Sequence, residues 1–242
     1  MDEETKDYLA FIVDPEVRQY CGPLFFSTSL TTPSGNILGN GSFALVNTGK
    51  MKLLVTCNHV WDEFKALRSQ DSNVMFSLCV DKFSPIIITD PDSLLVDADK
   101  RCDLATFDTK PVSDAFASGA LQFFDLNANR PPKLRDGDTL YMIGFPGKGR
   151  QTNESSLGFP RQPIGVAATQ VGNSSFYADV RKLNLNADDF GGISGCPCFL
   201  VLKDRPIRLV GFATGYAPNN VAMLQFTYAR YIQPDGIIQS MC

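Results

Sequence analysis

The chain has 242 residues, of which 44% are hydrophobic, and this is enough to form one or two packed cores. Its 22 Lys and Arg against 26 Asp and Glu give a net charge of −4, and neither sign forms a long run, which argues against nucleic-acid binding through a basic face. No uninterrupted stretch of about 18 apolar residues marks a transmembrane helix, so we expect a soluble protein with no membrane partner.

The first 35 residues predict an N-terminal arm. Residues 1–7 are acidic, whereas a secretory signal is basic and then strongly apolar, so we expect a cytoplasmic protein rather than an exported one. The short apolar runs that follow are broken by Pro15, Pro23 and Pro33, a pattern typical of irregular structure with at most one edge strand.

Residues 36–124 predict a first domain of short strands. The runs at 42–46 and 51–57 are largely apolar, and the turn residues between them favour a hairpin. A short helix is expected at 60–67, and further strands are expected at 74–80, 85–89 and 104–107. Many short strands at close spacing predict a closed or folded-over β architecture.

Residues 125–136 are polar, contain two consecutive prolines, and predict a linker between two halves. The second half, residues 137–242, again contains short apolar runs, interrupted by a polar loop at 147–157. Its strands are expected at 139–145, 164–171, 174–180, 198–202, 208–214 and 221–227, with a short helix after Tyr228. The two halves show no sequence repeat.

The segment Phe190–Pro197 contains a serine between glycines. Glycine permits a positive φ and a close backbone approach, so Gly192 and Gly195 could turn two amides towards one point while leaving the Ser194 hydroxyl accessible. Such amides, here those of Gly192 and Ser194, form an oxyanion hole beside a nucleophile. An ordinary tight turn is the alternative, because glycine and serine are common turn residues.

A serine nucleophile needs a base, and His59 is the only histidine of the chain. It follows an apolar run that predicts a buried strand, which would deliver the imidazole at its end. Asp103, at the start of another apolar strand, could orient the ring and stabilise its charged form. Each residue alone also fits a structural role, but the order His59, Asp103, Ser194 in these contexts favours a catalytic triad.

Three segments resemble the trypsin and chymotrypsin superfamily of serine proteases. Thr56–Val60 resembles the family's Thr-Ala-Ala-His segment, Cys102–Ala105 its Asp-Ile/Leu-Ala segment, and Gly192–Pro197 its Gly-Asp-Ser-Gly-Gly-Pro segment. The resemblance runs from about residue 39 to about residue 227, with support from 137–146 and 209–215. It implies an all-β, chymotrypsin-like fold of two Greek-key β-barrels packed side by side, with the active site in the cleft between them.

Two residues depart from that family. Ile193 stands where the secreted enzymes have the aspartate that pairs with a newly released amino terminus, so we expect no activation by N-terminal cleavage. Cys196 stands where they usually have glycine. The seven cysteines do not follow the disulfide pattern of secreted trypsins, so we expect small, buried, reduced thiols and no metal site.

These features predict a serine endopeptidase that hydrolyses peptide bonds of a protein or peptide substrate through an acyl-enzyme. Ser194 would attack, His59 would shuttle the proton, and Asp103 would fix the tautomer of His59. No cofactor would be required. The sequence does not predict the oligomeric state.

Two other functions compete with this one. The first is a binding module with the same fold that has lost turnover, for which Ile193 and Cys196 are the hints. The second is a cysteine protease. It is disfavoured because proline follows Cys196 and phenylalanine follows Cys198, whereas Ser194 alone has small neighbours.

The resemblance also implies a substrate pocket. Asp188 lies six residues before Ser194, as the specificity aspartate does in trypsin, and would line the pocket with Thr214, Gly215 and Tyr216. A buried carboxylate there favours Arg or Lys before the scissile bond, and Arg would gain most through a bidentate contact. Tyr216, however, stands where a glycine usually keeps the pocket open, and it would leave room for small residues only.

Overall fold

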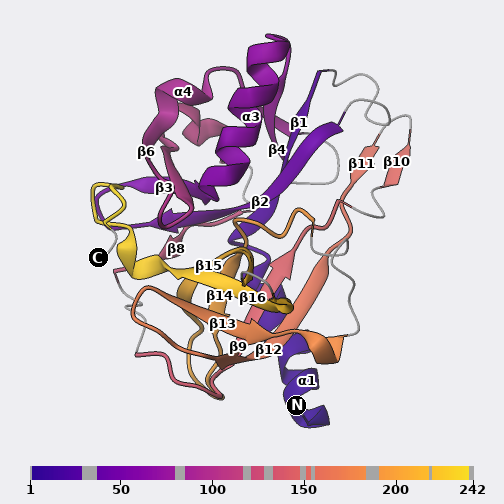
Figure 1. The fold of residues 1–242 in the computed structure, drawn as a ribbon, viewed down its shortest axis with the longest axis vertical. Helices are drawn as coiled ribbons and strands as arrows, with labels where there is room; N and C mark the ends of the chain where they lie inside the picture. Colours follow the sequence, from indigo (N-terminus) through magenta and orange to yellow (C-terminus); the bar gives the residue numbers. More distant parts are fainter. Residues whose placement is uncertain are drawn as a thin grey trace.

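The computed structural model describes residues 2–28, 37–79, 85–116, 121–127, 133–147, 151–153, 156–183, 191–217 and 220–239. They form two packed β structures, a curled half-barrel sheet from the first half of the chain and a closed barrel from the second (Figure 1). The expected all-β fold of two packed β-barrels is confirmed. Within these ranges, no helix has the length and apolar character that crossing a lipid bilayer demands.

The first sheet has the strand order β5-β4-β1-β2-β3-β7-β6, and the short β8 pairs in parallel with β2. Its strands are β1 Cys21–Ser27, β2 Ile37–Asn47, β3 Lys52–Thr56, β4 Met75–Cys79, β5 Pro85–Ile88, β6 Leu95–Asp99, β7 Leu104–Asp108 and β8 Phe124–Asp125. Short helices are α4 Pro91–Leu94 and the 3-10 turn Lys110–Phe116. Strand β6 was not predicted from the sequence, because all five of its residues are half-buried and two are acidic.

Strand β2 buries both of its faces. Phe43 and Leu45 belong to a core inside the curled sheet, whereas Ala44 and Val46 belong to the core that the second barrel forms. Successive side chains of a strand point to opposite faces, so burial on both sides requires a continuous apolar run instead of an alternating one. The first sheet therefore packs through one face onto the second barrel.

The second barrel closes in the order β12-β13-β16-β15-β14-β9. Its strands are β9 Thr139–Gly144, β12 Gln162–Thr169, β13 Ser175–Asp179, β14 Pro197–Leu200, β15 Arg208–Ala217 and β16 Asn220–Tyr228, with the 3-10 turn Arg181–Leu183 after β13. Strand β13 neighbours β16 and not β14, which is a Greek-key crossover. The first sheet repeats this order but stays open between β5 and β6, so the halves share a topology that their sequences do not show.

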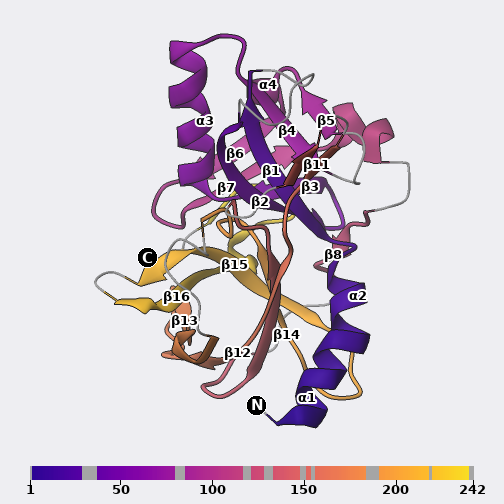
Figure 2. The same ribbon diagram turned by 90° about the vertical axis from the view of Figure 1, so that its right-hand side faces the viewer.

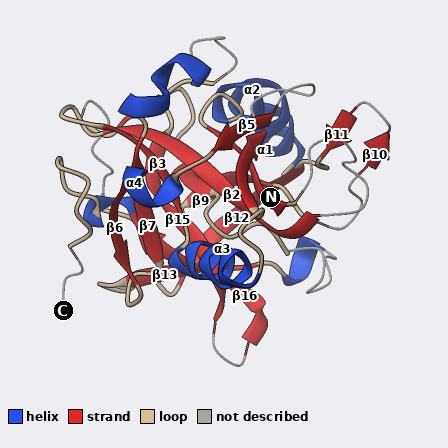
Figure 3. Cartoon of the chain, turned by 90° about the horizontal axis from the view of Figure 1, so that it is seen from above, coloured by secondary structure: helices blue, strands red, loops and turns tan. Residues whose placement is uncertain are grey.

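The expected polar loop at 147–157 contains a two-stranded hairpin. Strand β10, Gln151–Asn153, pairs with β11, Ser156–Gly158, and the hairpin projects from the side of the molecule (Figures 1 and 3). Polar composition predicts a loop, but it does not prevent main-chain pairing in a short exposed hairpin.

Helix α3, Asn58–Gln70, packs on the curled sheet and extends the helix expected at 60–67. The Trp61 ring stacks on Phe64 with centroids 5.4 Å apart, and it meets Phe107 of β7 edge-on at 5.2 Å. Aromatic pairs of this kind contribute about 0.5–1.5 kcal/mol each beyond burial of their area. They hold the first turn of α3, which carries His59, in a fixed position on β7.

The N-terminal segment is helical and packs on the second barrel, so the prediction of an irregular segment is wrong (Figure 2). It comprises α1 Glu3–Tyr8, a π-helical turn Leu9–Val13 and α2 Asp14–Val17. Leu9, Val13 and Val17, each four residues apart, are buried in the core of the second barrel. Pro15 is tolerated because it lies in the first turn of α2, where its missing N–H is not needed.

Strand β1 lies between β2 and β4 and is not an edge strand as expected. Pro23 pairs with Ser42 of β2, but pairing with β4 begins only at Leu24. Pro23 has no N–H to donate, and the ladder between β1 and β4 accordingly starts one residue later. The proline misplaced the strand because a central strand tolerates it at the end of one of its two ladders.

The C-terminal segment returns to the first sheet. After the 3-10 turn Ala229–Tyr231, residues 232–239 fold back on themselves through a bridge between Ile232 and Ile238. Three hydrogen bonds attach them to the first sheet: Thr48 Oγ1 to Pro234 O at 2.6 Å, Thr106 Oγ1 to Gly236 O at 2.8 Å, and Ile238 N to Asp97 Oδ2 at 2.8 Å. Each end of the chain thus packs on the β structure formed by the other half.

Candidate active site

His59 and Asp103 meet at one end of the first sheet. Helix α3 carries His59 in its first turn, and Asp103 immediately precedes β7. The Asp103 carboxylate accepts from the His59 backbone N–H at Oδ1 over 2.9 Å, and its Oδ2 lies 2.7 Å from Nδ1 of the ring. These two contacts fix the orientation of the imidazole and leave Nε2 as the ring atom that can exchange a proton with a substrate.

Asp103 adopts a left-handed backbone conformation, with φ of 52°. A non-glycine residue in this region costs about 1–3 kcal/mol, which the surrounding structure has to offset. The preceding carbonyl, of Cys102, accepts a hydrogen bond from Thr227 Oγ1 at 2.7 Å. Strand β16 of the second barrel therefore holds the turn that presents Asp103 to His59.

The surroundings of His59 raise the pKa of its imidazole above the ordinary value. Burial of the ring lowers this pKa, but the hydrogen bond and the negative charge of Asp103 outweigh burial, and the charges of Glu63 and Asp62 add to the rise. The His59 side chain is still 47% exposed, against 25% for Asp103. The imidazole is therefore able to hold a proton and accessible to a substrate.

The serine loop, residues 191–196, is anchored on β2 of the first sheet. Ser42 donates from Oγ to the Gly192 oxygen over 2.7 Å and from its backbone N–H to the Ser194 oxygen over 2.8 Å. Ser42 is fully buried, so neither bond competes with water. One residue of the first sheet thereby sets the position of the two loop residues that sequence analysis assigned to the oxyanion hole.

The Ala213 carbonyl of β15 joins the serine loop to the histidine segment. Gly195 N donates to it over 2.8 Å, and Cys57 Sγ, two positions before His59, donates to it over 3.1 Å. Gly195 has φ of +93°, and a Cβ there would lie 2.2 Å from the Ser42 oxygen. Glycine is required at this position both for its backbone conformation and for the close packing.

Ser194 lies beside the histidine helix. Its backbone oxygen and the Val60 side chain come within 3.3 Å and 2.9 Å, respectively, of the point that a Cβ on Gly41 would occupy. The Ser194 hydroxyl makes no hydrogen bond to His59, and both residues are among those described. In substrate-free active sites this bond is often long and tightens on binding. The serine loop thus lies close to Val60, the neighbour of His59, but no hydrogen bond joins Ser194 to His59.

The backbone amides of Gly192 and Ser194 are oriented by the carbonyls that precede them. Gly191 O accepts a hydrogen bond at 2.7 Å from the loop after β9, and Ile193 O accepts one at 2.9 Å from Cys196 N. In a trans peptide the N–H points opposite to the C=O, so both following amides are turned away from these partners. Neither amide has a backbone acceptor within the described part of the chain.

Gly192 fits only as glycine. Its φ is +96°, and a Cβ there would lie 1.9 Å from Asn40 Nδ2 and 2.7 Å from the Phe145 oxygen. Asn40 Nδ2 itself donates to the Phe145 oxygen over 3.4 Å. The side of Gly192 where a Cβ would stand is therefore packed directly against a side chain of β2.

Three residues of the predicted substrate pocket are described, and Asp188 lies outside the described residues. Thr214, Gly215 and Tyr216 follow Ala213 in β15, where the pairing with β16 shifts register. Gly215 has φ of +142°, and a Cβ on it would meet only open space. Tyr216 is half-buried against the core of the second barrel. The strand that holds the serine loop thus also carries these three residues.

None of the six described cysteines forms a disulfide bond with another described cysteine. Burial raises the pKa of Cys196 and Cys57 well above the ordinary value, and the charge of Asp103 adds to the rise at Cys57. Cys196 and Cys198 are fully buried. A buried, protonated thiol is a poor nucleophile, which argues further against a cysteine protease. The Sγ of Cys57 is one of three possible metal-ligand atoms that lie close together, with those of His59 and Asp103.

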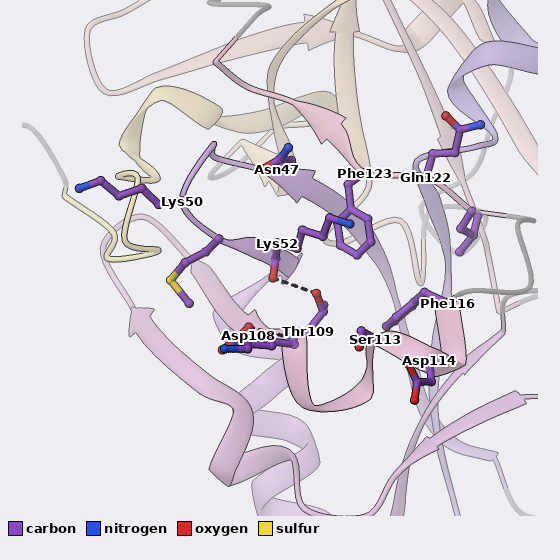
Figure 4. Close-up of a pocket in the computed structure, with 13 residues that line it drawn as sticks. Asn47, Lys50, Lys52, Asp108, Thr109, Ser113, Asp114, Phe116, Gln122 and Phe123 are labelled. Atoms are coloured by element: carbon purple, nitrogen blue, oxygen red, sulfur yellow. Dashed lines mark hydrogen bonds between the residues drawn. The ribbon is translucent and has the colours of Figure 1, made fainter.

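A cavity of about 960 Å³ lies at the other end of the same strands (Figure 4). It is lined in part by Lys52, at the start of β3, and by Asp108, at the end of β7, whereas the histidine and aspartate lie near the opposite ends. Lys52 Nζ sits 5.1 Å from the centre of the Phe123 ring, and the Lys52 oxygen accepts from Thr109 Oγ1 at 2.8 Å. The cavity is therefore separate from the candidate active site.

Ser42, which contacts the serine loop twice, was not predicted from the sequence as part of the site. A serine inside an apolar strand gives no signal of this role, because its partners lie about 150 residues away and are set by strand register. Nor was Cys57 predicted as a neighbour of the pair His59 and Asp103. The only available signal was its position two residues before the histidine.

No protein-family model matches the sequence, and no curated protein is similar to it in sequence. Among solved structures, Deg5 matches with a TM-score of 0.54 and 16% identity, over 93% of this chain and 90% of that one. The serine protease AL20 from an extremophilic microorganism matches with a TM-score of 0.49 and 15% identity, over 87% and 91%. The Rv3671c protease of M. tuberculosis, in its active form, matches with a TM-score of 0.49 and 15% identity, over 98% and 88%.

At these identities the likeness concerns the fold, and the match to Deg5 carries it. It agrees with the Greek-key order of the second barrel and with the same order in the first sheet. The chain therefore has the chymotrypsin-like fold of two packed β structures.

Proposed function

We propose that this protein is a serine endopeptidase with His59, Asp103 and Ser194 as its catalytic triad. The observation that carries the proposal is the double hydrogen bond between His59 and Asp103, placed next to the anchored serine loop. A protein that only binds partners gains nothing from a half-exposed imidazole held by a carboxylate near a serine between glycines. This arrangement of His59 and Asp103 supports acyl transfer as the reaction class.

In this proposal Ser194 Oγ attacks the scissile carbonyl carbon while His59 Nε2 takes its proton, and Asp103 stabilises the imidazolium that results. The oxyanion binds to the N–H groups of Gly192 and Ser194, each worth on the order of 3 kcal/mol. The imidazolium then protonates the leaving amine, and water releases the acyl group by the same steps in reverse. The route needs no cofactor.

We further propose that the enzyme is cytoplasmic and active without N-terminal cleavage. The buried thiols of Cys21, Cys57, Cys196 and Cys198 support a reducing compartment. Ile193 is buried and offers no charge for a new amino terminus. For substrates we favour proteins or peptides with a small residue before the scissile bond, because the resemblance would place Tyr216 on the wall of the predicted pocket.

Labelling with a serine-directed fluorophosphonate probe tests the proposal. Full-length protein made in a reducing cytoplasm should react as purified, and Ser194→Ala should not. If the probe still labels folded Ser194→Ala protein, the nucleophile is a residue other than Ser194.

The second candidate is a binding module with this fold. It is favoured because no hydrogen bond joins Ser194 to His59, whose ring contacts Asp103 instead. It predicts a folded wild-type protein that the probe does not label and that cleaves no member of a peptide library. The same library, applied to an active protein, gives the residue preferred before the scissile bond.

A further inference from the structure

One cluster of side chains has the composition of a metal site. The Cys57 sulfur, one ring nitrogen of His59 and one carboxylate oxygen of Asp103 all lie within 4.8 Å of one another. Cys57 is fully buried behind the other two side chains, which are partly exposed. The described part of the chain contains no other group of this kind.

The donor atoms of this cluster, one sulfur, one nitrogen and one oxygen, favour some metal ions over others. Thiolate and imidazole are ligands for zinc and its softer relatives, whereas magnesium and calcium prefer oxygen donors only. Zinc bonds of about 2.0–2.3 Å in a tetrahedral arrangement would place nitrogen and oxygen ligands roughly 3.3 Å apart. The present separation of Nδ1 and Oδ2 is 2.7 Å, so the two side chains have to separate by about 0.6 Å.

We propose that Cys57, His59 and Asp103 bind one zinc ion, which switches the active site off reversibly. The site requires only these three side chains, so it goes beyond the proposed peptidase activity and does not depend on Ser194. The partly exposed His59 and Asp103 give an ion access from solvent, and the sulfur supplies the ligand that ordinary serine protease triads lack.

Charge and protons balance at this site. The Cys57 thiol loses its proton to solvent and bonds to zinc as a thiolate. The proton that His59 shares with Asp103 moves from Nδ1 to Nε2, so that Nδ1 has a lone pair for the metal. One thiolate and one carboxylate then neutralise the two positive charges of the ion, and water completes the coordination.

Zinc bound in this way would abolish the proposed activity. With a proton on Nε2, His59 cannot accept the proton of Ser194, and Asp103 no longer stabilises an imidazolium. Inhibition should therefore be complete at saturation and reversed by EDTA, because no covalent bond to carbon forms.

Cadmium, which forms a near-ultraviolet charge-transfer band with thiolates, tests binding directly. The protein is the full chain with Ser194→Ala, which cannot turn over, and with Cys79→Ser and Cys242→Ser, so that every cysteine left besides Cys57 is a buried one. One equivalent of cadmium should produce the band, zinc should displace it, and magnesium should not. Cys57→Ala should weaken binding more than roughly 100-fold, since loss of outer-shell contacts alone costs 10–100-fold.

Cys198→Ala, which removes an equally buried thiol, should leave the band unchanged. If Cys57→Ala does not fold, His59→Ala still provides the test, because it changes a half-exposed side chain. His59→Ala should weaken cadmium binding by a similar factor. A band that is absent from the parent, or that survives in Cys57→Ala and His59→Ala, overturns the inference. Probe labelling of wild-type protein without metal reports on the proposed function separately, because a labelled enzyme that gives no cadmium band refutes only the zinc site.

Discussion

Ile193 fills the space that a side chain on Gly144 would need. A Cβ on Gly144, the last residue of β9, would lie 2.6 Å from Ile193 Cγ1, and Ile193 is only 2% exposed. The residue before the serine is thus packed into the second barrel, where the secreted enzymes carry a charge. Packing of an apolar side chain replaces an ion pair as the means of holding the serine loop.

Ile193→Asp should destabilise the protein by on the order of 3–5 kcal/mol, because it buries a charge without a partner. The milder Ile193→Val should cost about 0.5–1.5 kcal/mol. Urea unfolding measures both free energies, and probe labelling measures the state of the serine loop. A variant Ile193→Asp with wild-type stability would show that this side chain is not buried as described.

Ser42→Ala should lower kcat with little change in KM, because Ser42 positions the Gly192 carbonyl and touches no substrate. The Gly192 carbonyl would lose its donor, at a cost of about 1–3 kcal/mol in folding free energy. Ser77→Ala is the matched control: Ser77 is equally buried, and its hydroxyl has no hydrogen-bond partner among the described residues. Its removal should leave activity and stability unchanged or raise stability, and equal losses in both variants would contradict the role of Ser42.

The NMR titration of His59 should give a pKa above the ordinary value of about 6.5. The chain has one histidine, so its imidazole signals need no assignment. Asp103→Asn removes the main cause of the rise, and burial should then bring the pKa below 6.5. A pKa that does not fall in Asp103→Asn would mean that the carboxylate does not control the ring.

The same shift sets the pH dependence of stability and labelling. The folded state holds the His59 proton more tightly than the unfolded state, so the contribution of His59 to stability is fully present below pH 6.5 and is lost as the pH rises through the raised pKa. Probe labelling needs the neutral ring and should increase over the same pH range. Labelling that decreases with rising pH there would exclude His59 as the base.

His59→Ala and Ser194→Ala should each abolish nearly all turnover, and the double variant should be hardly slower than either one. Residues that act as one unit are strongly non-additive, because removing one already disables the other. Rates of peptide hydrolysis by the three variants decide this. Losses that multiply in the double variant would show that the two side chains act independently.

Leu9→Ala should cost about 2–5 kcal/mol of folding free energy, because Leu9 is buried in the core of the second barrel. Phe11→Ala, in the same helical segment, removes a side chain that is 74% exposed and should change stability by no more than about 0.5 kcal/mol. Denaturant unfolding of both variants measures the difference. If Leu9→Ala instead raises probe labelling at unchanged stability, the segment acts as an inhibitory prosegment.

The sequence predicted most strands because burial leaves a local trace. Phe43 and Leu45 face one core and Ala44 and Val46 the other, so the run is apolar throughout and easily recognised. The N-terminal helix escaped prediction because Pro15 reads as a helix breaker unless the start of a helix is already known. Position within an element, and not residue type alone, decides what a proline does.

The residues of the candidate site likewise differ in how far the sequence alone could predict them. His59, Asp103 and Ser194 stand in short segments whose residue types follow from their chemistry, and sequence analysis could select them one by one. Ser42 acts through the register of β2 against a loop far along the chain, and such a contact has no local signature. Asp188 lies outside the described residues, so the basic specificity that it implies stays a prediction.

The exchange of chain ends between the two β structures bears on how the protein unfolds. Leu9, Val13 and Val17 cover the second barrel, while the hydrogen bonds of Thr48 and Thr106 hold the last residues on the first sheet. Domains joined by a single linker usually move and unfold separately. Here each β structure is covered by a terminal segment of the other half of the chain, so separating the two would expose buried surface on both. The two therefore melt as one cooperative unit, and separate expression of residues 1–127 and 133–242 would give two fragments that regain a stable fold only when mixed.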